Sequence, residues 1–238
     1  MEFEREPVIQ RDGTAVRADI DEGLRAFMLK IYNYMCLALG VTGAVAMFTA
    51  SSETMMQAIY GTPLAYVVMF SPLAFILVLS FGINKLSVGA VQGLFWAFAV
   101  VMGLSMASIF MVYTGESIAK VFFITAGVFA AMSLYGYTTK RSLAAMGSFL
   151  FMGLIGIIIA MVVNMFLASS ALQFAISILG VLIFTGLTAW DTQKLKMIYI
   201  QSDGTAATEK TAIYGALTLY LDFINLFYFL LHLLGNRD

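Results

Sequence analysis

The chain has 238 residues, of which 61% are apolar and only 11% are charged, whereas about 25% of the residues of a typical soluble domain are charged. Its 13 Lys and Arg against 14 Asp and Glu give a net charge of −1, which argues against nucleic acid as a partner because no basic excess is present to neutralise phosphates. The single cysteine cannot form an internal disulfide, and the single histidine argues against a zinc site or a Ser-His-Asp triad.

The few charges fall mostly outside long apolar windows. Twelve charged residues lie within residues 1–30, and beyond them the uncharged windows cover residues 31–52, 54–84, 86–115, 121–139, 142–190, 211–221 and 223–236. A helix needs about 20 apolar residues to cross a hydrocarbon core of about 30 Å. Most windows therefore hold one membrane span each, and the longest window holds two.

In chain order, we expect a flexible polar tail over residues 1–25, without the apolar core of a signal peptide, and then one membrane domain over residues 26–238. The breaks include Gly61-Thr62-Pro63 before the second span and the uncharged turn Ala168-Ser169-Ser170 before the sixth. The predicted spans are 27–50, 64–83, 88–112, 119–138, 143–167, 171–195 and 211–234. Because backbone polar groups in lipid must be satisfied within the chain, these segments predict an all-α bundle of seven transmembrane helices.

The distribution of Lys and Arg predicts the orientation of this bundle. With the N-terminus in the cytoplasm, eleven of these residues lie on the cytoplasmic side, and only Lys120 and Arg237 lie outside. Cytoplasmic loops of membrane proteins carry the excess of Lys and Arg. We therefore predict a cytoplasmic N-terminus and an external C-terminus.

Two acids, Asp191 and Asp222, fall inside the predicted spans. A charged side chain at the centre of a membrane helix costs about 2.5–3.5 kcal/mol on insertion scales, so such residues usually face the bundle interior and are functional. The short loop between the last two spans makes these helices antiparallel neighbours, and the two carboxyl groups then face each other. A carboxyl pair in contact holds one proton between its members and titrates as a unit. Its oxygens would bind Ca²⁺ only weakly and transiently, because a tight site needs about six to eight oxygens.

Further polar residues share the faces of these two helices. Thr218, Asp222 and Asn225 recur at helical spacing with His232 near the same line, and Thr188 precedes Asp191 by one turn. We interpret these as candidate residues lining a pathway. The structural alternatives are an interfacial Asp191 paired with Lys194, an Asp222 that is merely buried and hydrogen-bonded, and a His232 that lies at the outer interface.

Two sequence stretches resemble the paired C-terminal signatures of the Bax inhibitor-1 family. They are FTGLTAWDTQKLK, from Phe184 to Lys196, and ALTLYLDFINLF, from Ala216 to Phe227. The stretches 103–110, 113–114 and 136–141 resemble the bacterial branch of that family, and the similarity extends over about residues 20–235.

This resemblance implies a seven-helix protein of the bacterial inner membrane that is not an enzyme and leaks calcium in a pH-dependent way. Calcium is then the transported ion, and no cofactor is expected. Asp191 and Asp222 correspond to the proton-sharing pair of the family. The resemblance also implies an ATP-dependent membrane protease as a candidate partner, which a non-catalytic regulator of this kind would restrain.

One departure from the family pattern concerns the residue that holds the pair closed. A basic partner is expected in the second helix, but residues 64–83 contain none, so the candidate latch is Lys85 or one of the N-terminal arginines. An intramembrane aspartyl protease is the enzymatic alternative. It is disfavoured because Leu219-Tyr220-Leu221 replaces the Gly-x-Gly motif expected before the second acid, and no proline follows Pro72.

Overall fold

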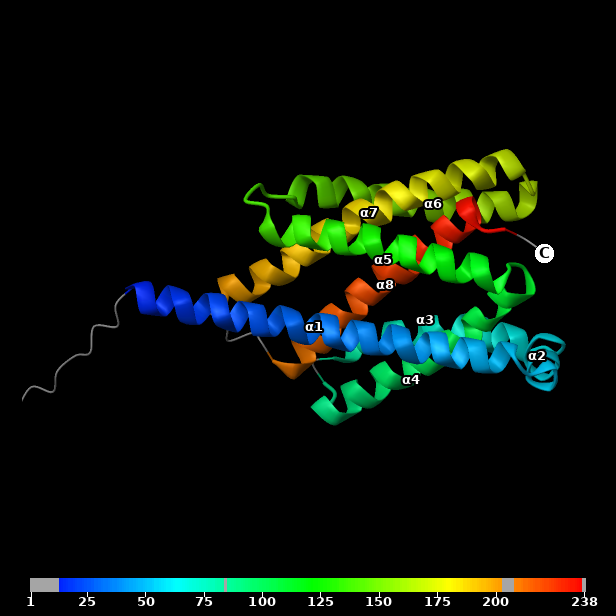
Figure 1. The fold of residues 1–238 in the computed structure, drawn as a ribbon, viewed down its shortest axis with the longest axis horizontal. Coiled ribbons are helices and arrows are strands. Elements are labelled where there is room, and N and C mark those ends of the chain that lie inside the picture. The colour runs from blue at the N-terminus through cyan, green and yellow to red at the C-terminus, as the bar shows by residue number, and fades with distance from the viewer. Residues whose placement is uncertain (1–12, 84, 203–207, 237–238) are drawn as a thin grey trace, which may run out of the picture.

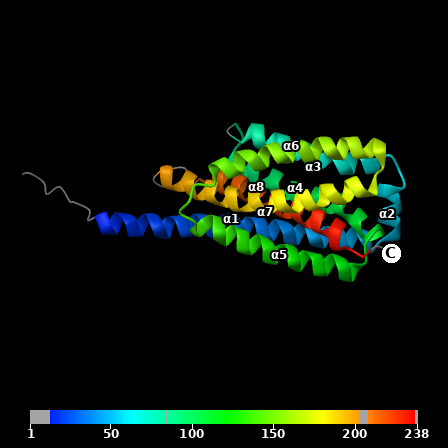
Figure 2. The same cartoon turned by 90° about the horizontal axis from the view of Figure 1, so that it is seen from above.

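The computed structural model describes residues 13–83, 85–202 and 208–236, with side chains from residue 22 onward in these ranges. The long helices run antiparallel along one bundle (Figures 1 and 2), and the described ranges contain no strand. The elements are α1 (Gly13–Ala50), α2 (Glu53–Tyr60), α3 (Leu64–Gly82), α4 (Val88–Met106), the 3₁₀ helix η1 (Ala107–Met111), α5 (Gly115–Thr138), α6 (Ala144–Leu167), α7 (Ser170–Gln201) and α8 (Glu209–Leu234).

Within the described residues, seven helical segments are long and apolar enough to cross a membrane. The first runs from Glu22 to Ala50, and α4 continues through η1 to form the third. The predicted all-α bundle of seven spans is therefore confirmed. The short helix α2, which connects the first two spans, was not predicted.

The orientation of the bundle in the membrane stays a prediction. The start of α1 and the end of α8 lie at opposite ends of the bundle (Figure 1), as an odd number of spans requires. Three of the basic residues used for the orientation, Arg5, Arg11 and Arg237, lie outside the described residues.

Helix α1 begins well before the predicted first span. It starts at Gly13, so residues 13–25, which we expected to belong to a flexible tail, are helical. The segment contains two Ala, two Arg and one Leu, which favour helix, and it continues without Pro into the apolar span. The prediction from polarity alone therefore placed the end of the tail later in the chain than the start of α1. The rest of the predicted tail, residues 1–12, lies outside the described residues.

Helix α8 occupies the centre of the bundle. It packs against α1, α4, α5 and α7, whereas α3 packs mainly on α4, and α6 packs on α7. In its most apolar window 56% of α8 is buried, compared with 17% for α3 and for α6. Any polar side chain that α8 carries toward its neighbours is therefore enclosed by protein.

Local chemistry explains where the helices begin and turn. At five helix starts a hydroxyl accepts a hydrogen bond from the backbone N–H of the first turn, which is the usual N-cap; these caps are Ser52, Ser87, Thr114, Ser169 and Thr208. Between α6 and α7, Ala168 adopts a left-handed conformation with φ of 47°. The backbone N–H of Ser169 donates to Asn164 Oδ1 at 3.0 Å. The uncharged turn predicted at residues 168–170 is thus confirmed.

Helix α2 packs at the C-terminal end of α4. The hydroxyl of Tyr60 donates to the carbonyl oxygens of Leu104 and Ser105, at 2.5 and 3.0 Å, where α4 changes into η1. Burial raises the pKa of this hydroxyl above its ordinary value, so it stays a hydrogen-bond donor at neutral pH. The tyrosine therefore adds a hydrogen bond to carbonyl groups at the end of α4 that also accept from the Ala107 N–H and from the Ser108 hydroxyl.

Helices α5 and α7 approach most closely at Gly136. A Cβ atom added there would lie 2.1 Å from the carbonyl oxygen of Ala189, two residues before Asp191. Only a glycine permits this backbone contact, which fixes the height of α7 relative to α5.

We predict that Gly136→Leu destabilises the bundle by about 1–3 kcal/mol, the usual cost of overpacking. The measurement is the thermal unfolding midpoint of the detergent-solubilised protein. Gly127→Leu, on the same helix, is the matched control because open space surrounds its Cβ position. Equal midpoints for the two variants would contradict the close approach.

Candidate functional site: a carboxyl pair between α7 and α8

The two acids predicted from the sequence meet at the interface of α7 and α8. Asp191 projects from α7 and Asp222 from α8, and these helices form the most extensive helix pair of the bundle. Both side chains are buried, with 7% and 5% of their surface exposed. Their carboxyl groups lie close enough to interact with each other. A hydrogen bond between two carboxyl groups requires a proton on one of them.

One oxygen of the pair has no other partner. Asp222 Oδ2 is buried and receives no hydrogen bond from any N–H or O–H group among the described residues. Buried polar atoms without partners are rare, and each needs an explanation. The predicted proton shared with Asp191 would account for this atom, because an oxygen that carries a proton or accepts one from its neighbour has no further need of a donor.

Lys194 is the cation that interacts with this carboxyl pair. It lies one turn after Asp191 on α7 and interacts electrostatically with both carboxyl groups. Its ammonium group lies 5.0 Å from the centre of the Trp190 ring, a cation–π contact. Among the described side chains it forms no ion pair within 4 Å, so the alternative of a closed Asp191–Lys194 pair is not what the structure shows.

The candidate latch, Lys85, lies in the connection between α3 and α4. Its side chain is exposed, and it makes no ion pair with the described acids. Its role as a latch stays a prediction.

The other polar residues of the predicted pathway are hydrogen-bonded within the protein. Three of them donate to a carbonyl oxygen one turn earlier on their own helix: Thr188 to Phe184 at 2.8 Å, Thr218 to Tyr214 at 3.0 Å and Asn225 to Leu221 at 2.8 Å. His232 Nδ1 lies 3.1 Å from the hydroxyl of Tyr113, and its ring packs against Tyr228. Such bonds suit polar groups in an apolar bundle, and a role of these residues in lining a pathway stays a prediction.

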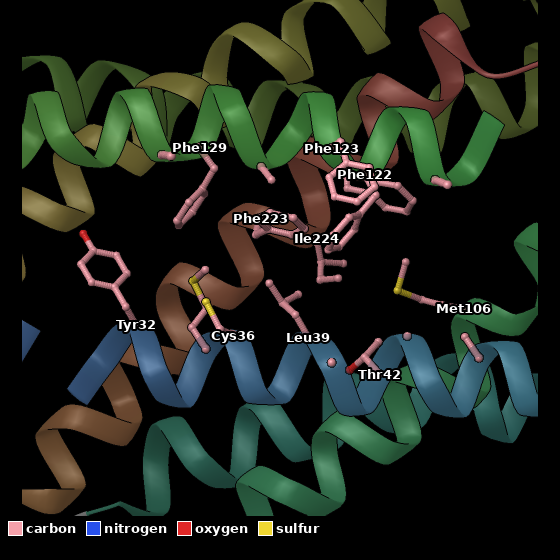
Figure 3. Close-up of a pocket in the computed structure, with 18 of the residues that line it drawn as sticks. Tyr32, Cys36, Leu39, Thr42, Met106, Phe122, Phe123, Phe129, Phe223 and Ile224 are labelled. Atoms are coloured by element: carbon pink, nitrogen blue, oxygen red, sulfur yellow. The ribbon is translucent and has the colours of Figure 1, made fainter. Parts of the chain in front are cut away.

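A large cavity lies on a different face of α8. It measures about 1400 Å³ and is lined mainly by α1, α5 and α8, with Phe223, Ile224 and Phe227 contributed by α8 (Figure 3) and Met106, Ile109 and Phe110 by α4 and η1. Neither the two acids nor Thr188, Thr218, Asn225 and His232 line this cavity. Helix α8 therefore presents the carboxyl group to α7 and an apolar face to the cavity.

A second polar cluster, which the sequence analysis missed, surrounds Glu209 at the start of α8. Its carboxylate forms an ion pair with Lys30 and accepts a hydrogen bond from the Tyr34 hydroxyl, both on α1. Gln92 of α4 donates to the same hydroxyl at 3.0 Å. The sequence feature that could have indicated this cluster is Gln92. It is an amide inside an apolar span, and a polar group in hydrocarbon needs a hydrogen-bond partner.

The residues that could hold a metal are few. No group of three or more His, Cys, Asp or Glu side chains comes together within the described part of the chain. Asp191 and Asp222 thus stand as two carboxylates, fewer ligands than a tight Ca²⁺ site requires.

Comparisons with known proteins agree with this architecture. A model of the family described as inhibitor of apoptosis-promoting Bax1 matches residues 24–238. The chain is 48% identical over 218 residues to the inner membrane protein YbhL of Escherichia coli K12, covering 90% of this chain and 93% of YbhL. It is 49% identical over 224 residues to an uncharacterised protein of Rickettsia prowazekii, covering 94% of this chain and 95% of that protein.

We predict that Glu209→Gln lowers the stability of the bundle by about 1 kcal/mol, because the ion pair is partly exposed and solvent screens it. The thermal midpoint should then fall by about 2–4 °C. Glu116→Gln is the matched control, since Glu116 is also a first-turn acid and lies exposed at the start of α5. A fall of the same size in both variants would show that only the helix dipole is at work.

Proposed function

The chain belongs to the Bax inhibitor-1 family and is a multi-pass protein of the inner membrane, and we propose that it is a calcium leak channel whose flux depends on pH. The observation that carries this proposal is that the carboxyl groups of Asp191 and Asp222 lie close together at the buried interface of α7 and α8. The resemblance to the family supports the choice of calcium as the ion.

The proposed gate is the proton that the two carboxyl groups share. While it is present, it joins α7 to α8 through a hydrogen bond in a dry interface, where such bonds are strong. Its loss removes that bond and leaves two negative charges in contact, which repel each other in a medium of low dielectric. The flux of Ca²⁺ therefore changes across the pH range in which the pair titrates.

The small number of ligands suits a leak. Two carboxylates attract Ca²⁺ but do not supply the six to eight oxygens, approximately, that hold it tightly. An ion that reaches the ionised pair therefore remains only briefly. We assign to Lys194 the task of limiting the negative charge at this point, because its charge acts on both carboxyl groups.

The decisive variants are Asp191→Asn and Asp222→Asn, each of which mimics one permanently protonated member of the pair. We predict that combining the two substitutions removes the pH dependence and leaves the flux of the wild type at its acid limit, where both carboxyl groups are protonated. The measurement is Ca²⁺ efflux from proteoliposomes over a pH series on both sides of neutrality. Glu53→Gln, an acid in the first turn of α2, should retain the pH dependence of the wild type.

The double Asn variant separates the proposed function from its alternative. A pH-dependent flux that persists in this variant would contradict the gate. If the protein is instead a non-catalytic regulator of an ATP-dependent membrane protease, capture of that protease by the full chain is the same in the wild type and in the double variant, and neither protein carries a flux.

A further inference from the structure

The cavity between α1 and α5 is a groove that follows the length of the bundle. Helices α1 and α5 form its walls and α8 forms its floor (Figure 3). Arg25 and Tyr137 line one end, and Met47 and Gly115 line the other. Small residues line the walls and leave space between the helices, namely Gly40, Gly43, Ala44, Ala119, Ala126 and Ala130.

The groove offers almost nothing to hold water. The Thr42 hydroxyl, one of its few polar lining groups, is already bonded to the Ala99 carbonyl and to Tyr220, at 2.9 and 2.7 Å. The Ser133 hydroxyl is bonded to Thr192 at 3.1 Å. A buried water needs two to four polar partners, so an apolar space of this kind favours a hydrocarbon occupant.

Charge gathers at only one end of the groove. Arg25 is the one charged residue that lines it; it is exposed and forms no ion pair with the described acids. Tyr32 and Tyr137 line the same end, and Lys196 donates to the Tyr137 carbonyl at 2.6 Å. Tyrosines with Lys and Arg mark the membrane interface, here the one that we expect to face the cytoplasm.

We infer that this groove binds an anionic phospholipid of the cytoplasmic leaflet, with an acyl chain lying between α1 and α5 and the phosphate at Arg25. The apolar walls suit the chain, and the Arg25 guanidinium, which forms no ion pair with the described acids, suits the phosphate, which it can bind through two parallel hydrogen bonds. A transmembrane helix of another protein would fill the apolar space but would leave the guanidinium without its anion. This inference does not depend on the calcium flux, because the carboxyl pair lies outside the groove.

The chain offers a direct test of the acyl-chain site. Open space surrounds the Cβ positions of Gly40 and Gly43, so Gly40→Phe and Gly43→Phe place a ring in the groove without displacing a neighbour. Gly156→Phe on α6 is the matched control, since its Cβ position is also open but lies outside the groove. Native mass spectrometry of the full chain, taken from bilayers of equal phosphatidylglycerol and phosphatidylcholine, measures the lipid retained.

We expect the wild type and Gly156→Phe to retain phosphatidylglycerol, and both groove variants to lose it while their thermal midpoints stay unchanged. Arg25→Gln should reduce the preference for phosphatidylglycerol over phosphatidylcholine about fivefold, the effect of one cation near an anionic membrane surface. Arg141→Gln, an exposed cation that does not line the groove, should keep the preference.

Two results would overturn the inference. One is equal retention of phosphatidylglycerol by the groove variants and Gly156→Phe. The other is a disulfide-linked dimer that forms on oxidation in the membrane through Cys36, the single cysteine of the chain, which is exposed and lines the groove. Such a dimer would place a second copy of the chain where we place the lipid.

Discussion

The hydrocarbon of the bilayer supplies no hydrogen-bond partners, so each polar group of the central helix must find its partner in the helices around it. Helix α8 meets this constraint through specific contacts. The Tyr220 hydroxyl reaches Thr42 on α1, whose hydroxyl also donates to Ala99 on α4. Glu209 joins α8 to the same two helices through Lys30 and Gln92. These polar contacts fix which helices surround α8, while apolar packing fixes how closely they approach.

In the proposed gate, the carboxyl pair meets this constraint through a proton and not through a donor group of the protein. On that proposal, an ionised pair with an unpartnered oxygen is costly, so the stability of the α7–α8 interface depends on protonation in a way that the other polar contacts do not. Thr188 and Asn225 lie close by in sequence, yet each is satisfied by its own backbone at any pH. In our proposal, Asp191 and Asp222 are therefore the residues that make this interface sensitive to pH.

The sequence predicted the spans, and the burial of the two acids between the last two helices, because both leave a strong local signal; that the two acids share a proton stays a prediction. Charge-free windows of bilayer length mark the spans, and an acid such as Asp222 in the middle of one must face protein. The sequence did not reveal α2, which is too short to cross a membrane, or the helical start at Gly13, where polarity conceals helix propensity. The Glu209 cluster and the groove were also missed, because they depend on how α1, α4, α5 and α8 pack, and no spacing within one helix records that arrangement.

The two faces of α8 connect the proposed gate to the proposed lipid site. Asp222 and Phe223 are adjacent, so about 100° of helix rotation separates the side chain at the α7–α8 interface from one on the floor of the groove. A shift of α8 that separates it from α7 therefore also moves the floor of the groove. A bound ligand changes such an equilibrium only by its difference in affinity for the two states. An acyl chain that packs better on one position of Phe223 and Phe227 would bias the proton-dependent contact without touching either carboxyl group. The calcium flux would then depend on the lipid composition of the cytoplasmic leaflet.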